Sequence, residues 1–464
     1  MTQDDETGRP PTAPGSRARR VATSRAERGR RRARGERGRR VAGGRRKAPQ
    51  PGKTVVKVIC ASLLSLGLLT GLGVVMVYNN WNSNIDRLDV SNQLTNRPDK
   101  EKVEGPREPI SILVMGSDTR AGEGNGIDGE STNGLSDTTI LFHLSANRKF
   151  AYGISIPRDT AVMRPACKKP DGTVVPASGG YEKWNAAFAY GGPACTMQQF
   201  EQVTGIRLDN YVVVDFNQFK DMVNALDGVE VCIPEDIDDE VRNIHLKAGT
   251  REVKGDEALT YVRARYRIGD GTDPNRTRRQ QAFIGSMINK ALTAGMLARP
   301  DRLIGFMNAA TSSLQTDFKG IAQMADLAMT AKGIGPENIK FITTPWVYSD
   351  KVSSGIEWTP EVEKLWRLVR EDRPLTPEFL KDALSAGDKP DGSPSVDAGG
   401  SGAPSGSPSD AASPSGSAAG SPSGSPSGGA SGSPSGTPGG TASNPTPPPS
   451  GLSASGREAA GLCT

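Results

Sequence analysis

The chain has 464 residues, and its 57 Lys and Arg nearly balance its 52 Asp and Glu, giving a net charge of +5. Residues 1–53 hold 17 of the basic residues and only 5 acidic ones, so the rest of the chain is acidic. Because the basic charge is confined to one end, a uniformly basic nucleic-acid-binding protein is excluded. The length suits one large domain or two ordinary ones.

Both ends of the chain have compositions that cannot bury a core. Residues 1–53 are Arg-rich and lack aromatic residues, and no charged residue occurs from Ala411 to Gly456. We expect a disordered leader over residues 1–53 and a disordered Ser/Pro/Gly-rich tail over residues 385–464. The leader suits anionic lipid head groups, whereas binding of nucleic acid would rest on its charge alone.

An uncharged run of 21 residues, from Val58 to Tyr78, predicts a transmembrane helix over residues 55–78. A buried core helix has the same composition, but the flanking sequence supplies no core to cover it. A cleaved signal peptide would begin nearer the N-terminus. Because positive charge is dense before the run and residues 79–89 after it are polar and nearly neutral, we expect a single span with the leader in the cytoplasm and the remainder outside the cell.

After a polar stalk at residues 79–108, the composition of residues 109–384 predicts a folded domain. Short apolar, β-branched runs predict strands at residues 110–116, 138–144, 150–156, 211–216 and 258–265. Helical periodicity occurs at residues 196–203, 217–226, 276–297, 300–314, 321–331 and 360–369. Interleaved strands and helices indicate the α/β class, with an α/β/α sandwich around a central mixed sheet.

Cysteine usage agrees with a domain outside the cell. Cys167 and Cys195 bracket an insertion rich in Gly, Pro and Lys, and we expect a disulfide that closes this loop in an oxidising compartment. The partners of Cys232 and Cys463 stay open. With only two histidines in the chain, a zinc site or a Ser/His/Asp hydrolase has little support.

Polar residues lie at the ends of predicted strands, where ligands of open α/β sheets bind. Asp118 and Arg120 come just after the first strand, and Asp137 immediately precedes the second. Two carboxylates at such an edge could hold Mg²⁺, which prefers oxygen ligands. Taken alone, the pair is more typical of loop capping.

Arginines gather at the same strand ends. Arg158 and Asp159 follow the third strand, and Arg263 and Arg265 are two residues apart, so a strand would place both guanidinium groups on one face.

The helix that follows adds three more polar side chains. Arg276, Arg279 and Gln280 have the spacing of one helical face. Convergent guanidinium groups beside carboxylates predict a clamp for a doubly phosphorylated group, because planar guanidinium forks match phosphate oxygens. A solvated salt-bridge network would explain the charges, but it would not explain their gathering at element ends.

Five motifs then carry a resemblance that covers about half of the chain. They occur in the order ILVMGSDTR, SDTTILFHLSANRKFAYGISIPRDT, KWNAAFAYGG, YVVVDFNQFKDMVNALDGVEVCIP and LTYVRARYRIGDGTDPNRTRRQQAFI. From Ile110 to about Thr344 the chain resembles the LytR-CpsA-Psr family of wall-polymer ligases. The resemblance implies an enzyme that transfers a glycopolymer from a polyprenyl-pyrophosphate carrier to peptidoglycan through a phosphodiester. Some family members have a further folded C-terminal domain, which the tail replaces here.

The resemblance also implies roles for the candidate residues. Asp118 and Asp137 would hold Mg²⁺ at the pyrophosphate, supported by Arg120. The residues that would bind the phosphate oxygens are Arg158, Arg263, Arg265 and Arg276. The polar pocket for the substrate would be completed by Lys183, Asp273, Arg279 and Gln280. Asp159 is a candidate base for the attacking sugar hydroxyl. The carrier lipid would occupy an apolar pocket between sheet and helices, with Phe283, Met287 and Ile288 as candidate lining residues or as simple core residues.

Three alternatives remain open at this point. A pyrophosphatase would use the same clamp with water as the acceptor. A transcriptional regulator would need its folded domain on the same side of the membrane as DNA, so we expect no nucleic acid as a partner. A wall-binding protein without activity would have no need of both aspartates and the full arginine set.

Overall fold

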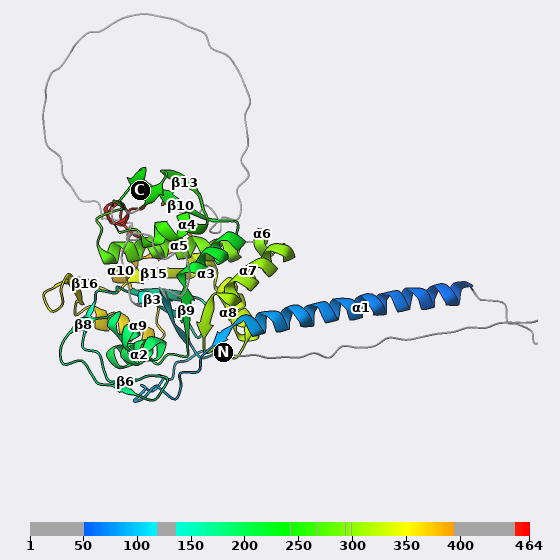
Figure 1. Ribbon diagram of the computed structural model, residues 1–464, viewed down its shortest axis with the longest axis horizontal. Coiled ribbons are helices and arrows are strands. Elements are labelled where there is room, and N and C mark those ends of the chain that lie inside the picture. The colour runs from blue at the N-terminus through cyan, green and yellow to red at the C-terminus, as the bar shows by residue number, and fades with distance from the viewer. Residues whose placement is uncertain are drawn as a thin grey trace, which may run out of the picture. The chain divides into compact units, whose positions relative to one another are not determined.

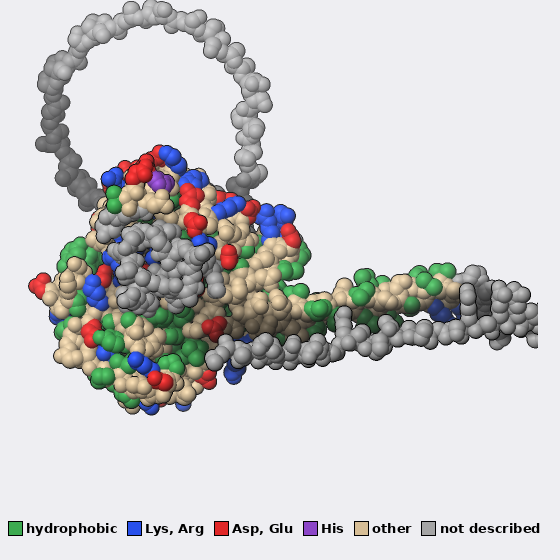
Figure 2. Space-filling model, in the orientation of Figure 1, with side chains coloured by type: hydrophobic (Ala, Val, Ile, Leu, Met, Phe, Trp, Pro, Cys, Tyr) green, Lys and Arg blue, Asp and Glu red, His purple; other side chains and the backbone are tan. Residues whose placement is uncertain are grey.

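The computed structural model describes residues 51–117, 136–241, 243–265, 267–292, 294–297, 299–393 and 451–464. The chain divides into two units, residues 1–68 and residues 69–464. Helix α1 (Pro51–Asn84) is long and apolar enough to cross a membrane, and Figures 1 and 2 show its length and its exposed hydrophobic side chains. The predicted span over residues 55–78 lies within it. Within the part of the chain that the structure describes, α1 is thus the one candidate for a single membrane span.

An eight-stranded mixed sheet forms the centre of the second unit, in the order β1-β14-β9-β2-β3-β4-β15-β18. Its strands are β1 (Asp86–Arg87), β2 (Ile110–Ser117), β3 (Ser136–Leu144), β4 (Ala151–Ile156), β9 (Asn210–Asp215), β14 (Leu314–Thr316), β15 (Ile339–Thr343) and β18 (Leu384–Ser385). β2 is antiparallel to β3 and parallel to β9, and β4 is antiparallel to β3 and parallel to β15. β2, β3, β4 and β9 confirm the first four predicted strands.

Helices cover both faces of this sheet, because its strands alternate apolar side chains between two cores. On β2, Leu113 and Met115 point into the core with α2 (Ala186–Thr204) and α9 (Val362–Arg370), whereas Ile112 belongs to the opposite face. The opposite layer contains α3 (Phe216–Ala225), α4 (Gly255–Arg263), α5 (Asp273–Leu292), α7 (Pro300–Ser312) and α8 (Ile321–Ile334), as Figure 1 shows. The α/β/α sandwich with a mixed sheet is confirmed.

Short elements complete the domain. Two-stranded sheets pair β10 (Val229–Ile233) with β13 (Gly249–Val253), β11 (Ile237–Asp239) with β12 (Ile244–Leu246), β16 (Trp346–Ser349) with β17 (Gly355–Trp358), β5 (Ala161–Val162) with β8 (Glu182–Lys183), and β6 (Cys167–Lys168) with β7 (Val174–Val175). The short helices are α6 (Ala294–Leu297), α10 (Pro377–Leu380), α11 (Ala454–Ala459) and the 3₁₀ turn Pro336–Asn338.

The predicted strand at residues 258–265 is wrong, because this segment lies in helix α4 and the turn after it. Every residue from Ala258 to Arg263 is buried, so the apolar pattern shows neither a period of two nor one of 3.6 residues. The residues that indicate a helix come just before Ala258. Asp256 and Glu257 occupy the first turn, where acidic side chains stabilise a helix N-terminus.

The predicted stalk at residues 79–108 is not a free spacer. Ile85 and Val90 are buried, and β1 pairs with β14 at the edge of the sheet. Arg97 forms a hydrogen-bonded ion pair with the fully buried carboxylate of Glu201. Buried charges need such partners, so this segment is part of the folded domain.

Two disulfides close the domain. Cys167–Cys195 confirms the predicted pair, and Cys232 pairs with Cys463 across 231 residues. The prediction of a disordered tail over residues 385–464 is therefore wrong for residues 451–464, which fold back and include α11. The Ser/Pro/Gly-rich part at residues 394–450 lies outside the described residues.

Candidate active site

Charged side chains from three elements meet at one edge of the sheet. β3 is antiparallel to β4, with Thr139 opposite Ile156, so Asp137 near the start of β3 lies close to Arg158 just past the end of β4. Helix α5 begins at the same place with Asp273. The side chains of all three residues are at least nine-tenths buried.

Arg158 lies at the centre of this cluster. Its guanidinium donates to the Asp137 carboxylate, and its Nε lies 3.6 Å from Asp273 Oδ1 and 4.0 Å from Asp159 Oδ2. Burial disfavours the charged form, but the carboxylates of Asp137, Asp273 and Asp159 outweigh burial and raise the pKa of Arg158 above its ordinary value. The group is a permanent cation at any physiological pH.

Asp273 joins this cation to two others. Its Oδ2 accepts a hydrogen bond of 3.0 Å from the backbone N–H of Arg158, and its Oδ1 accepts from the guanidinium of Arg276, one helical turn later. The same oxygen lies 3.7 Å from Arg265 Nη2. Arg276 Nη2 also lies 3.4 Å from the carbonyl oxygen of Asp137, so α5 is fastened to β3.

Asp159 holds the outer side of the cluster. Its Oδ1 accepts from Lys183 Nζ at 2.8 Å, and its Oδ2 accepts from Arg265 Nη2 at 3.3 Å. Lys183 reaches this position because β8 pairs with β5, which places it opposite Ala161. The lysine is the most exposed member, so the cluster opens toward solvent on this side.

The structure brings together most of the site residues predicted from the sequence. The cluster contains Asp137, Arg158, Asp159, Lys183, Arg265, Asp273 and Arg276. Arg263 is the buried last residue of helix α4. The prediction that Arg263 and Arg265 share one face of a strand is therefore wrong. Asp118 and Arg120 lie outside the described residues.

Arg279 does not join the cluster. Its guanidinium is buried and donates to the carbonyl oxygens of Tyr261 at 3.0 Å, of Ala460 at 3.3 Å, and of Ala264. Burial, together with nearby Arg276, lowers the pKa of Arg279 to about 10, so it stays charged at neutral pH. Residues three apart on a helix differ by about 60° in direction, and here this angle sends Arg279 to the end of α4 instead. The predicted substrate-binding role therefore does not fit its position.

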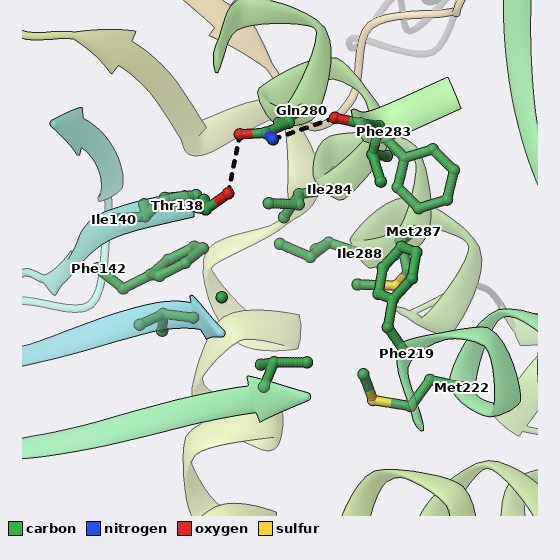
Figure 3. Close-up of a pocket in the computed structure, with 14 residues that line it drawn as sticks. Thr138, Ile140, Phe142, Phe219, Met222, Gln280, Phe283, Ile284, Met287 and Ile288 are labelled. Carbon is green, nitrogen blue, oxygen red and sulfur yellow. Dashed lines mark hydrogen bonds between the residues drawn. The ribbon is translucent and has the colours of Figure 1, made fainter. Parts of the chain in front are cut away.

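A pocket of about 270 Å³ lies beside the cluster, between the sheet and α3, α4 and α5. Gln280 lies at its polar end, accepting from Thr138 at 3.1 Å and donating to the carbonyl of Val262 at 3.1 Å (Figure 3). The rest of the lining is apolar: Val114, Gly116, Ile140, Phe142, Val214, Phe219, Met222, Phe283, Ile284, Met287 and Ile288.

Helix α5 supplies both parts of the site from one face. Arg276 and Gln280 are followed at the helical spacing by Ile284 and Ile288, which point into the pocket in Figure 3. Phe283, Met287 and Ile288, for which the sequence left both pocket lining and core packing open, line the pocket, and Phe283 and Met287 also pack in the core. The contribution of Phe219 on α3 was not predicted, although the amphipathic pattern of residues 217–226 marks one apolar face there.

One of the two predicted metal ligands can be examined for its fit to a metal. Asp137 is a buried carboxylate at the strand edge, next to the cations that would face phosphate oxygens. Among the described residues, no three His, Cys, Asp or Glu side chains gather as a metal site. Mg²⁺ is commonly held by one or two carboxylates together with substrate phosphates and water, so the chemistry of Asp137 fits it.

The fold and the site together define a membrane-linked α/β/α domain with a cationic cluster beside an apolar pocket. The model of the LytR_cpsA_psr family matches residues 77–371, and the chain belongs to this family.

Relatives with described roles are similar to the same region. Over 259 residues the chain is 31% identical to the polyisoprenyl-teichoic acid–peptidoglycan teichoic acid transferase TagV of Bacillus subtilis, covering 54% of this chain and 61% of that protein. It is 28% identical over 268 residues to the corresponding transferase TagU of Enterococcus faecalis, covering 57% of this chain and 80% of that protein. The match thus spans less than two thirds of TagV. The crystal structure of B. subtilis TagV has a TM-score of 0.43 at 27% identity, covering 58% of this chain and 99% of that one.

Proposed function

We propose that this protein is a membrane-anchored phosphotransferase that moves a glycopolymer from a polyprenyl-pyrophosphate carrier to peptidoglycan. The observation that carries the proposal is the single face of α5, on which Arg276 and Gln280 lead directly into the apolar residues Ile284 and Ile288. A ligand that fits both parts has an anionic head and an apolar chain, and a polyprenyl pyrophosphate has both. The transferase names of TagV and TagU agree with this donor.

The cluster supplies what phosphoryl transfer needs, namely positioning and neutralisation of charge. Arg158, Arg265, Arg276 and Lys183 contact the three carboxylates of the cluster, so the cations outnumber the carboxylates by one and pyrophosphate oxygens would compete with the carboxylates for them. The acceptor hydroxyl oxygen bonds to the phosphorus that carries the glycopolymer. The bond from that phosphorus to the bridging oxygen breaks, and polyprenyl phosphate leaves.

Asp137 is the described residue that would hold Mg²⁺, with Asp118 as its partner from the sequence. A bound Mg²⁺ would supply further positive charge to the pyrophosphate oxygens. Arg158 already pairs with Asp137 in this structure, so a bound metal and this arginine would share the Asp137 carboxylate.

Asp159 is our candidate acceptor for the proton of the attacking hydroxyl. Both of its oxygens accept hydrogen bonds from cations, one from Lys183 and the other from Arg265. These cations disfavour protonation of Asp159, and phosphate oxygens that bind Arg265 would draw that guanidinium away and make Asp159 a better proton acceptor.

We further propose that the domain lies outside the cell, with residues 1–53 in the cytoplasm. The Arg-rich leader precedes α1, which is the orientation that the positive-inside rule favours. Two disulfides in the domain suit an oxidising compartment. The alternatives of hydrolysis and gene regulation gain no support from this site or from TagV and TagU.

The proposed function is tested with the full-length protein in detergent micelles. The protein is incubated with Mg²⁺, a polyprenyl-pyrophosphate-linked oligosaccharide and peptidoglycan oligomers, and mass spectrometry is used to detect a phosphodiester-linked product. We expect the product with the wild-type protein and its loss in Arg158→Lys. Hydrolysed carrier without a linked product would instead identify a pyrophosphatase.

A further inference from the structure

A second cleft, of about 280 Å³, lies at the same edge of the sheet as the cluster. It is unlike the apolar pocket, because its lining mixes hydroxyl, charged and aromatic side chains. The residues that matter here are Arg278, Thr343, Thr344, Trp346, Glu378 and Asp382. Neither the family resemblance nor the proposed donor site assigns a ligand to it.

The topology of the sheet places this cleft next to the cluster. β15 is parallel to β4, and the Thr344 N–H donates to the carbonyl of Ser155 at 3.0 Å. Thr344 therefore lies one strand away, about 5 Å, from the chain that continues into Arg158. On the other side of β4, β3 leads to Thr138 in the apolar pocket. Pocket, cluster and cleft thus follow one another along a single edge.

A hairpin gives a second link between cleft and cluster. The N–H of Ile356 on β17 donates to the Asp159 carbonyl at 3.1 Å, and Thr160 bridges to the same strand. β16 pairs with β17 and carries Trp346 into the cleft. The Trp346 ring contacts that of Tyr348 at 5.2 Å, and Tyr348 is 71% exposed. The strand that pairs with these aromatic residues is therefore hydrogen-bonded to the backbone of Asp159.

The chemistry of the cleft excludes some ligands and favours one class. Its carboxylates, Glu361, Glu378 and Asp382, outnumber its cations, Arg278 and Lys381, which is unfavourable for a second phosphate or a polyanion. The Trp346 ring offers flat apolar area. The Thr343 hydroxyl accepts from Gln281 Nε2 at 3.2 Å and still has its O–H to donate, whereas Thr344 is fully buried and accepts from Trp358. A saccharide ring needs this combination, because it has apolar C–H faces and a rim of hydroxyl groups.

Arg278 adds a charge that the cluster does not use. It lies on a different side of α5 from Arg276, and its guanidinium donates to Asn275 Oδ1 at 2.9 Å. Among the described residues it makes no ion pair. It can therefore bind a carboxylate on a substituent of the saccharide without any internal pair being broken.

We propose that this cleft binds the acceptor glycan of peptidoglycan and presents one of its hydroxyl groups to the phosphorus held at the cluster. This proposal rests on the proposed function, and it adds the place and the chemistry of acceptor recognition. The hydroxyl oxygen bonds to phosphorus as the bond to lipid phosphate breaks, and the hydroxyl proton goes to Asp159. Donor lipid and acceptor glycan enter from opposite sides of the cluster.

The proposal is tested by two-substrate kinetics on the full-length protein. We expect Trp346→Ala and Arg278→Gln each to raise KM for a peptidoglycan oligosaccharide about tenfold, with KM for the polyprenyl-linked donor unchanged. Trp346→Phe should recover most of the loss. Tyr348→Ala, at an exposed side chain, avoids a folding defect and should raise the acceptor KM about threefold. Tyr190→Ala is the matched control, because Tyr190 is 45% exposed on α2 and its ring contacts Arg164 rather than Trp346.

Separate results distinguish failure of this proposal from failure of the proposed function. If the wild type forms linked product and the Trp346, Tyr348 and Arg278 variants keep its acceptor KM, the cleft is not the acceptor site. If the wild type forms no linked product, the proposed function fails, and oligosaccharide binding is then measured by NMR without donor. Binding that weakens in Trp346→Ala supports a saccharide site, whereas no binding, or binding that the variant leaves unchanged, overturns it.

Discussion

The backbone N–H of Arg158 donates a hydrogen bond of 3.0 Å to Asp273 Oδ2, which ties the end of β4 to the first turn of α5. The other oxygen of Asp273 faces Arg265 and Arg276. One carboxylate thus orients groups from a strand end, a loop and a helix. Its role is to position the arginines rather than to contact the reacting atoms.

Asp273→Asn should therefore show the effect of losing the negative charge of Asp273 while its side chain keeps nearly the same shape. The amide oxygen can still accept from the Arg158 N–H, but the negative charge that gathers Arg265 and Arg276 is lost. We expect kcat/KM for transfer to fall at least about tenfold, and the free energy of unfolding to fall by about 1–3 kcal/mol. Steady-state kinetics and denaturant unfolding check both effects. A variant with wild-type kinetics would contradict the positioning role.

Arg158→Lys keeps the charge and removes the planar fork. Because a lysine cannot bridge Asp137 and Asp273 and also bind phosphate oxygens in the same way, we expect transfer to fall about 100-fold or more. Arg302→Lys is the matched control, since Arg302 pairs with Asp227 at the surface, away from the cluster. An equal loss of transfer activity in the two variants would show that the planar guanidinium of Arg158 is not needed for the reaction.

The pH dependence of the wild type should show no titration of Arg158. Its carboxylate neighbours raise its folded-state pKa above its ordinary unfolded-state value, so the stabilisation is fully present at every pH below that unfolded-state value. That stabilisation is lost only as pH rises through the still higher folded-state pKa. The free energy of unfolding should thus lose no Arg158 contribution between pH 6 and about pH 10. A loss in this range that disappears in Arg158→Gln would contradict this assignment.

If the donor's lipid binds in the apolar pocket, the effect of a substitution there on KM should depend on the length of the lipid. Ile284→Trp adds a large ring to the pocket, and we expect it to raise KM about tenfold for a long polyprenyl donor and much less for a short-chain analogue. Met329→Trp, at a side chain that is 62% exposed on α8, is the control. A length-independent effect of Ile284→Trp would mean that the lipid binds elsewhere.

The C-terminal segment should stabilise the loop between Arg265 and Asp273. The Asp270 N–H donates to the Ala459 carbonyl at 2.9 Å, and Gly269 has a φ of +61° and no space for a side chain against Ala459. We expect deletion of residues 451–464 to lower the free energy of unfolding by about 2–4 kcal/mol and to speed hydrogen exchange in this loop. Deletion within residues 394–450 is the control, and unchanged exchange in the first variant would contradict the role.

The local sequence pattern was sufficient to predict which charged residues lie at the edge of the sheet. It failed for side chains whose positions depend on packing against elements distant in the sequence. Asp137 and Arg158 adjoin apolar runs long enough to be strands, so their meeting follows from strand pairing. Arg276 and Arg279 have the same helical spacing, and only the position of α4 decides which one reaches the cluster. Cys463 follows a Ser/Pro/Gly-rich segment whose composition does not indicate where the chain goes next. The sequence near Cys463 therefore could not predict its pairing with Cys232.

The most direct test of the central claim is whether one amphiphilic donor occupies both the cluster and the pocket. The full-length protein in micelles would be titrated with polyprenyl pyrophosphate, with the matching polyprenyl alcohol and with inorganic pyrophosphate. We predict that the whole donor binds at least about 100-fold more tightly than either part, and that Arg276→Gln lowers the affinity for the whole donor about tenfold while leaving the affinity for the alcohol unchanged. Equal affinity for the whole donor and for inorganic pyrophosphate would contradict the account.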